Sequence, residues 1–327
     1  MNASALLPLA VSGGIALAAM AANLPAAADP LIEPDELAAR LGEDHLAILD
    51  IRSQPRDAAQ DVFAQGHVPG AVHGDYVTGG WRTEVDGVVG MAPTPVALET
   101  MIGNLGIGND DEVVIVNAGT DASDFGSAAR VYWTFKYLGH DDVAILDGGF
   151  RGWTEDASRP VEAGPSVVRE PKIFTASLHP EILISSDEVL ATLNDPRVVR
   201  VDARPENQYR GEAQHPRALG AGRIPGSVGV EQAIFFDDRG RLLPREQLEG
   251  LVPEKVKSGD ADMVVSYCNT GHWAATDWFV LSQMLGYRNV RLYDGSMTGW
   301  TADPSRPLST GPDELDKISR WVPARQG

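Results

Sequence analysis

The single cysteine of this 327-residue chain is the residue whose type and setting could do covalent chemistry. Cys268 follows the apolar run Met263-Val264-Val265-Ser266-Tyr267 and precedes a stretch with helical spacing from Ala274 to Leu285. A turn between a strand and a helix leaves backbone N–H groups without partners at the positive end of the helix dipole. Such a setting stabilises anions and favours the thiolate form of a cysteine. We interpret Cys268 as a thiolate nucleophile; the alternative is a small buried apolar residue, the common fate of an isolated cysteine.

Composition and charge limit the classes of function that the chain could have. Its 327 residues exceed what one hydrophobic core usually supports, so two domains are expected. A hydrophobic share of 43% beside 22% charged residues is typical of a soluble globular protein. The net charge of −19 argues against nucleic acid as a partner, because binding to phosphates needs clustered Lys and Arg. Any site for a small anion must therefore be built locally, from backbone amides and a few arginines.

The first 28 residues differ in composition from the rest of the chain. Residues 1–28 contain no charged side chain, and Ala26-Ala27-Ala28 resembles a small-residue cleavage site. The pattern predicts a signal peptide over 1–28, export to the periplasm, and a mature chain without stable membrane insertion. A membrane anchor is the alternative, and Pro8 and Gly13 count against it. Export also places the chain in an oxidising compartment, where a lone cysteine is unusual unless it is used.

From residue 29 onward the sequence contains an internal repeat. Five segments recur in the same order, which indicates a duplicated domain. The halves are offset by 151 residues at Val116 and Tyr267 but by 147 at Trp153 and Trp300, so the first half carries four extra residues. We expect these within 117–126, between strand and helix. The paired segments are 49–53 with 201–205, 66–72 with 222–228, 113–116 with 264–267, 138–139 with 285–286, and 146–153 with 293–300. In this alignment Asn117 stands where Cys268 should be, so only the second half has a nucleophile.

The alternation of short β-branched runs with helical stretches predicts the fold class. We expect an α/β protein of two tandem domains, each a mainly parallel sheet with helices on both faces. Helices are predicted over 94–105, 127–138, 187–193 and 274–285. Ligands of such sheets bind at the carboxyl ends of the strands, where Cys268 falls. The expected order is a silent domain at 29–153, a linker at 154–180, a catalytic domain at 181–305, and a tail at 306–327 with a short helix over 312–321.

The repeated motifs resemble those of a known family. Two Asp-x-Arg strand ends, two Gly-x-[Ile/Val]-Pro-Gly-[Ala/Ser]-Val turns, two Asp-Gly endings before Trp, and one Cys-x-x-Gly-x-x-Ala loop are together similar to the tandem-domain rhodanese sulfurtransferases. The resemblance covers about residues 30–305. It implies a silent first domain and Cys268 as the nucleophile. It also implies a substrate-binding loop of Asn269, Thr270, Gly271, His272 and Trp273, with no metal and no organic cofactor.

The chemistry implied by the resemblance is covalent. Cys268 would attack the outer sulfur of a small anionic donor such as thiosulfate, expel sulfite and carry a persulfide, which cyanide or a thiol acceptor then removes. Loop N–H groups would hold the negative end, as an oxyanion hole does. A cysteine phosphatase uses a similar cradle, but its loop ends in an Arg that grips phosphate, and here that position is Ala274.

The sulfur donor is the finer question. Mercaptopyruvate enzymes of the family typically show a Cys-Gly-Ser-Gly-Val-Thr loop, a His-Met-x-Pro segment and an Arg six residues after the second-domain Asp. This chain has Cys-Asn-Thr-Gly-His-Trp, Gly90-Met91-Ala92-Pro93 and Gln208 at those places, which favours thiosulfate. Arg210 could supply the anion contact or be a solvated charge. The alternatives are a mercaptopyruvate sulfurtransferase, a non-enzymatic sulfane-sulfur carrier, and a scaffold in which Cys268 is inert.

The remaining candidates divide by whether both halves contain them. Residues in matching places of both halves are predicted to be structural: Arg52 and Arg204 at the sheet ends, His67 and Arg223 in the turns, and Trp153 and Trp300 in the cores. Trp273 has no counterpart in the first half, so it could form a pocket wall. His272 could be a proton source, an anion contact or an idle loop residue. The sequence gives no oligomeric state.

Overall fold

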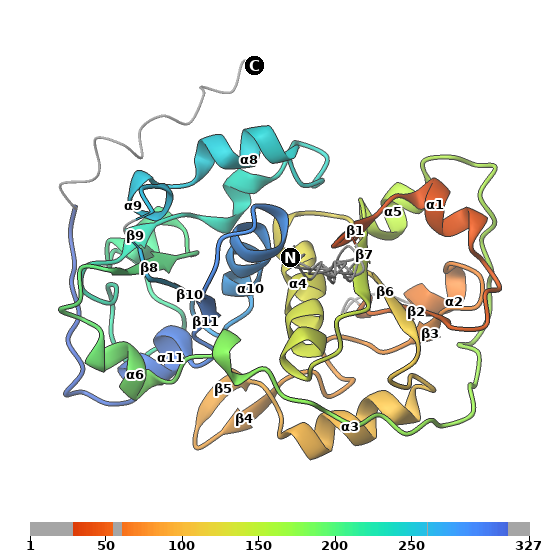
Figure 1. Ribbon diagram of the computed structural model, residues 1–327, viewed down its shortest axis with the longest axis horizontal. Coiled ribbons are helices and arrows are strands. Elements are labelled where there is room, and N and C mark those ends of the chain that lie inside the picture. Colours follow the sequence, from red (N-terminus) through yellow and green to blue (C-terminus); the bar gives the residue numbers. More distant parts are fainter. Residues whose placement is uncertain (1–28, 55–60, 260, 313–327) are drawn as a thin grey trace, which may run out of the picture.

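The computed structural model describes residues 29–54, 61–259 and 261–312, which form two α/β domains side by side (Figure 1). The predicted leader at 1–28 lies outside the described residues, as does all but the first residue of the predicted tail helix at 312–321. Both stay predictions. In the described part of the chain, no helix has the length and apolar character needed to span a membrane.

The first domain is a five-stranded parallel sheet. Its strands are β1 (Leu31–Ile32), β2 (Leu46–Asp50), β3 (Val72–His73), β6 (Glu112–Val116) and β7 (Val143–Leu146), in the order β1-β7-β6-β2-β3. Its helices are α1 (Pro34–Ala39), α2 (Val62–Gln65), α3 (Pro95–Asn104), α4 (Ala122–Tyr137) and α5 (Gly149–Thr154). An antiparallel hairpin of β4 (Thr83–Val85) and β5 (Val88–Met91) projects from this domain beneath the second (Figure 1).

The second domain repeats the plan with four parallel strands. These are β8 (Val198–Asp202), β9 (Val228–Gly229), β10 (Met263–Tyr267) and β11 (Val290–Leu292), in the order β11-β10-β8-β9. The α-helices are α6 (Ser186–Ala191), α7 (Glu206–Tyr209), α8 (Arg245–Leu251), α9 (Glu254–Lys257), α10 (Trp273–Trp278) and α11 (Ser296–Thr301). Two 3₁₀ turns, η1 (Pro180–Ile182) and η2 (Gln232–Phe235), and a π-helical segment, η3 (Phe279–Met284), complete it.

Alternate residues of each strand point to opposite faces, and both faces are buried under helices. In β6, Val114 and Val116 belong to a core with α1, α2 and α5, whereas Val113 and Ile115 belong to a core with α3 and α4. The second core continues across the domain boundary, through α4 and α10, and includes Cys268. The predicted fold class is confirmed, and the two domains share one apolar interface.

The helix predicted over 127–138 begins five residues earlier in the structure. α4 starts at Ala122 instead of residue 127, because the Asp121 side chain accepts hydrogen bonds from the N–H groups of Ser123 and Asp124 and caps the helix. The loops between strand and helix, 117–121 and 268–272, therefore have equal length. The extra residues of the first half lengthen its helix, and Asn117 is the true counterpart of Cys268.

The duplicated residues do the same structural work in both halves. Arg52 pairs with Asp50 at 2.7 Å and donates to the Gly66 carbonyl. Arg204 pairs with Asp202 at 2.6 Å and donates to the Gly222 carbonyl. The sequence-based prediction that both arginines stabilise the sheet ends is confirmed.

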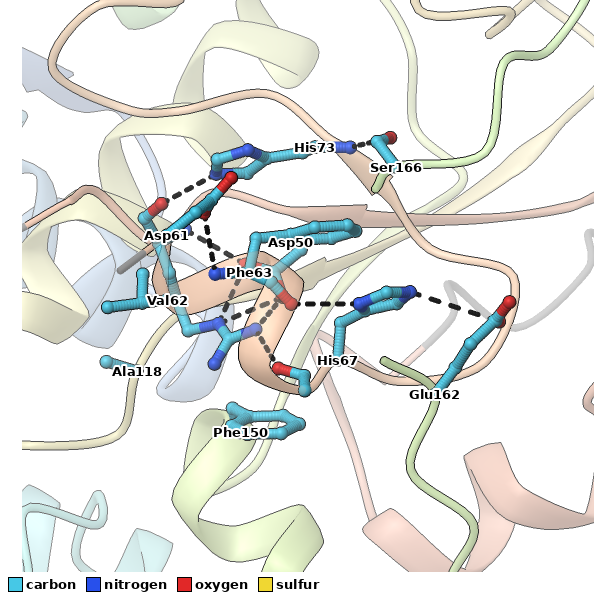
Figure 2. A network of polar contacts seen from close by, with 12 residues as sticks. Asp50, Asp61, Val62, Phe63, His67, His73, Ala118, Phe150, Glu162 and Ser166 are labelled. Atoms are coloured by element: carbon cyan, nitrogen blue, oxygen red, sulfur yellow. Dashed lines mark hydrogen bonds and ion pairs between the residues drawn. The ribbon is translucent and has the colours of Figure 1, made fainter. Parts of the chain in front are cut away.

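The other duplicated residues are buried as well. His67 stacks on Phe63 and contacts its carbonyl at 3.0 Å, as Figure 2 shows, and Arg223 donates to the Gly311 carbonyl. Trp153 and Trp300 are both 0% exposed, and each indole N–H donates to a proline carbonyl seven residues later. Their predicted structural roles are confirmed.

Between α5 and η1 the chain runs along the first domain without a helix or strand. It is attached by backbone hydrogen bonds, such as Lys172 N–H to the Gly103 carbonyl and Ser177 N–H to the Leu138 carbonyl. Segment 155–179 thus connects the domains as a strap on the surface of the first.

Candidate active site

Cys268 lies directly after β10, at the carboxyl edge of the second domain's sheet, and is 1% exposed. Its carbonyl accepts a hydrogen bond from Met297 N–H, and its own N–H donates to Ser296 Oγ at 3.0 Å. Gly271 N–H donates to the same hydroxyl at 3.1 Å. Ser296 has a positive φ of 48°, an uncommon conformation for a residue with a side chain. In this conformation its hydroxyl accepts both loop hydrogen bonds and so anchors the loop.

The remaining loop amides are the available donors of the site. Among the described residues, no group accepts a hydrogen bond from the backbone N–H of Asn269, Thr270, His272 or Trp273. Buried amides without partners carry a free-energy cost, which an anionic ligand removes. The loop can therefore hold the negative end of a bound sulfur species beside Cys268.

The silent copy shows what such a loop binds. Asn117 occupies the place of Cys268, and its carbonyl accepts from Phe150 N–H just as the Cys268 carbonyl accepts from Met297 N–H. The Asp124 carboxylate occupies the loop, accepting from Asn117 Nδ2 at 2.7 Å and from the Gly119 N–H at 2.6 Å. Burial raises the pKa of Asp124, and these donors oppose the rise. In the silent domain, the anion cradle is filled by the protein itself.

The predicted loop residues follow Cys268 directly, and Arg210 is the residue that ends α7. Asn269 Nδ2 donates to Gln208 Oε1 at 2.8 Å, so the residue that replaces the family's Arg holds the loop. Arg210 pairs with Glu206 at 2.5 Å across one helical turn. This ion pair neutralises the Arg210 guanidinium in the free protein, and a role in anion binding would require exchanging Glu206 for the ligand.

His272 is held by the silent domain. Its Nδ1 lies 2.8 Å from Tyr76 Oη and its Nε2 lies 2.9 Å from the Ser123 carbonyl. A carbonyl can only accept, so Nε2 carries the proton and Nδ1 accepts from the phenol. Burial, and then the charge of Arg82, lower the pKa of His272 from 6.5 to about 3. The ring is therefore neutral and both of its nitrogens have partners, which favours a structural role over use as a proton source.

This assignment predicts the pH behaviour of His272. Its neutral form is favoured by folding, so its contribution to stability is complete above pH 6.5 and decreases as the pH falls towards about 3. We expect NMR of the imidazole nitrogens to report the neutral ring with the proton on Nε2 at pH 6, with no titration between about pH 5 and 8. A midpoint near the ordinary value of 6.5 would contradict the assignment.

The silent domain makes two further contacts with the loop, one at Trp273 and one at Thr270. Trp273 Nε1 donates to Ser123 Oγ at 3.0 Å, so this indole is anchored between the domains. A Cβ added to Gly90 would lie 2.8 Å from the Thr270 carbonyl oxygen, and Gly90 has a φ of +86°. Only glycine allows the β4–β5 hairpin to approach the loop this closely.

A buried ion pair joins the domains behind the loop. Arg130 of α4 is 0% exposed and donates to Asp294 Oδ1 at 2.5 Å and to the Gly271 carbonyl at 3.0 Å. Asp294 Oδ2 accepts in turn from Ala92 N–H at 2.7 Å. Through Arg130 and Asp294, these contacts hold Gly271 in a fixed position relative to the residues that follow the hairpin.

Sequence reasoning missed the residues that the first domain supplies. Tyr76, Arg82, Ser123 and Arg130 belong to no local motif, because their partners lie far along the chain. Ser296 of the second domain was also missed, but here the sequence did hold a signal. The repeat has Gly149 at the matching position, and both residues have a positive φ, so the change from glycine to serine marks a place where a side chain is needed. No group of His, Cys, Asp or Glu in residues 29–54, 61–259 and 261–312 could hold a metal ion.

The comparisons with known proteins agree with this geometry. The rhodanese-like domain model matches residues 33–156 and again 185–303. The "Probable 3-mercaptopyruvate sulfurtransferase" of Pseudomonas aeruginosa is 34% identical over 289 residues, which cover 86% of this chain and 98% of that protein. The thiosulfate sulfurtransferase of Rattus norvegicus is 33% identical over 259 residues, covering 77% and 84%. The crystal structure of SseA from Escherichia coli superposes with a TM-score of 0.69 at 25% identity, covering 82% and 98%.

Fold and site together define a pair of rhodanese-like domains, of which only the second has a cysteine at the strand end. The chain belongs to the tandem-domain rhodanese sulfurtransferases. Its activity is the transfer of sulfur, with Cys268 in the place of the family's nucleophile.

Proposed function

We propose that the protein takes the sulfane sulfur of thiosulfate onto Cys268 and passes it to cyanide or a thiol. In the first step the Cys268 thiolate attacks the outer sulfur of thiosulfate; the new S–S bond forms as the old one breaks, and sulfite leaves with the electron pair. In the second step the acceptor attacks the terminal sulfur and the Cys268 thiolate leaves. The free amides of Asn269, Thr270, His272 and Trp273 hold the persulfide's negative end.

One observation carries this proposal. The loop after β10 has backbone donors without partners around a single buried thiol, whereas the matching loop of the silent domain has no thiol and binds its own Asp124 carboxylate. The contrast between two copies of one loop supports an anion site that is open in one domain and closed in the other.

The donor is the part of the proposal that most needs an experiment. Gln208 stands where mercaptopyruvate enzymes of the family have an Arg, so this site lacks the paired N–H donors of a guanidinium that would bind the substrate's carboxylate. This difference favours thiosulfate. 3-Mercaptopyruvate is the second candidate, because the relative at 34% identity carries that name. For that donor, Cys268 would attack the thiol sulfur and the C–S bond would break, leaving pyruvate after protonation of its enolate.

We expect kcat/KM for thiosulfate to exceed that for 3-mercaptopyruvate by about tenfold or more. The reason is that Gln208 cannot make the charged hydrogen bond that an Arg would make with the carboxylate of 3-mercaptopyruvate, and one such bond has about this effect. The measurement is steady-state thiocyanate formation with each donor at equal cyanide. Gln208→Arg should raise kcat/KM for 3-mercaptopyruvate. A preference for 3-mercaptopyruvate in the wild-type protein would replace the donor and keep the mechanism.

A further inference from the structure

Arg82 of the silent domain reaches the catalytic loop from the base of the β4–β5 hairpin. Its Nη1 donates to Tyr76 Oη at 3.0 Å, and that phenol is the group hydrogen-bonded to His272. A point 3.3 Å from Arg82 Nη2, where a Cβ on Gly90 would lie, is 2.8 Å from the Thr270 carbonyl. Arg82 as a residue is half-buried, so part of it is open to solvent.

The charge of Arg82 is not neutralised in the free protein. Other buried guanidiniums near the site have carboxylate partners: Arg130 has Asp294 and Arg204 has Asp202. Within the described part of the chain, Arg82 forms no ion pair, and its one hydrogen-bond partner is the Tyr76 phenol. In a chain of net charge −19, an arginine left without a carboxylate beside a cradle of free amides is unusual.

The groups that face Arg82 are kept neutral. Burial raises the pKa of Tyr76, so the phenol keeps its proton. Burial together with the Arg82 charge lowers the pKa of His272 to about 3, and burial, Arg217 and Arg82 lower the pKa of His215. The positive field at this edge of the loop is therefore uncompensated at neutral pH, and it opposes the long-range repulsion of anions by the acidic chain.

We propose that Arg82 binds the oxyanion end of the sulfur donor, the sulfonate of thiosulfate or the carboxylate of 3-mercaptopyruvate, while the donor's outer sulfur meets Cys268. This inference rests on the proposed function and names the residue that recognises its substrate class. The free donors of a guanidinium match a sulfonate or carboxylate in pairs. The silent domain then supplies the residue that binds the donor's oxyanion end, although it has no nucleophile of its own.

The test separates the two half-reactions. Loading is followed by rapid quenching and intact mass as thiosulfate adds one sulfur to Cys268. Discharge is followed with dithiothreitol, a thiol acceptor that has no sulfonate or carboxylate group. In Arg82→Gln we expect the second-order rate constant for loading to fall by about 10- to 100-fold, the effect of losing a charged hydrogen bond. Discharge should stay within about twofold of wild type, because dithiothreitol carries no sulfonate or carboxylate for Arg82 to bind.

Two further variants sharpen the result. Arg82→Lys keeps the charge without the fork and should recover part of the loading rate. Arg217→Gln removes a positive charge of the same size at the hairpin itself, where Arg217 pairs with Glu84 of β4 at 3.0 Å, and should load as wild type does because that charge already has a carboxylate partner. Equal slowing of loading and discharge in Arg82→Gln would overturn the proposal in favour of a structural role through Tyr76 and His272. Unchanged loading would overturn it directly.

A binding measurement keeps the two proposals distinguishable. Calorimetry of thiosulfate with Cys268→Ser, and with the same variant carrying Arg82→Gln, measures recognition without sulfur transfer. A dissociation constant raised about tenfold or more by the second substitution is expected. If wild-type protein took no sulfur from any donor, the proposed function would fail, and the calorimetry would still decide whether Arg82 binds the anion.

Discussion

Replacing Cys268 with serine is expected to lower the rate of sulfur transfer by at least about 10³-fold, as loss of a covalent nucleophile does in other enzymes. A serine hydroxyl does not ionise at neutral pH and cannot form a persulfide. The side chain is 1% exposed and close in size to serine, so the fold should survive. Thiocyanate formation from thiosulfate and cyanide measures the effect.

The control for this variant is its structure. Far-UV circular dichroism and the unfolding midpoint of Cys268→Ser should match those of wild type, since the loop is anchored through backbone atoms and Ser296 Oγ. A folded Cys268→Ser that retained wild-type turnover would place the nucleophile elsewhere. Because the chain has no second cysteine, it would exclude a persulfide mechanism altogether.

Replacing Arg130 with methionine is expected to destabilise the protein by about 3–5 kcal/mol, because it strands the buried Asp294 carboxylate without its cation. The pair closes at 2.5 Å with the arginine side chain fully buried. The same guanidinium holds the Gly271 carbonyl, so the loop should loosen and the rate should fall together with the stability. Urea unfolding followed by tryptophan fluorescence gives the free energy of unfolding.

A double variant distinguishes a stranded charge from lost packing. Arg130→Met combined with Asp294→Leu removes both charges, and its loss of stability should be smaller than that of Arg130→Met alone. An Arg130→Met protein as stable as wild type would mean that the ion pair does not join the domains. A double variant less stable than either single one would assign the effect to packing at Ala92 and Gly271.

Local patterns predicted much of the fold and part of the site. The duplicated segments predicted the two domains, the buried roles of Trp153 and Trp300, and the replacement of the nucleophile by Asn117. The start of α4 was predicted wrongly, because the Asp121 cap follows a loop whose length the offset alone did not reveal. Helical spacing predicted the stretch after Trp273, but its second half winds as a π-helix, η3.

The missing part of the site comes from contacts between the domains. Tyr76 meets His272 and Arg130 meets Asp294 across 196 and 164 residues, and no spacing rule relates such positions. Even the role of His272 depended on them, because neutral partners and the nearby Arg82 decide the charge of its ring. The catalytic loop could be found from sequence, whereas the groups that hold it could not.

The most direct test of the account is the intact mass of the protein before and after incubation with thiosulfate, and again after cyanide, with Cys268→Ser alongside. A persulfide mechanism at Cys268 predicts a gain of one sulfur, about 32 Da, that cyanide removes as thiocyanate and that the serine variant never acquires. No gain with thiosulfate, 3-mercaptopyruvate or a persulfidated protein, or an equal gain in Cys268→Ser, would contradict it.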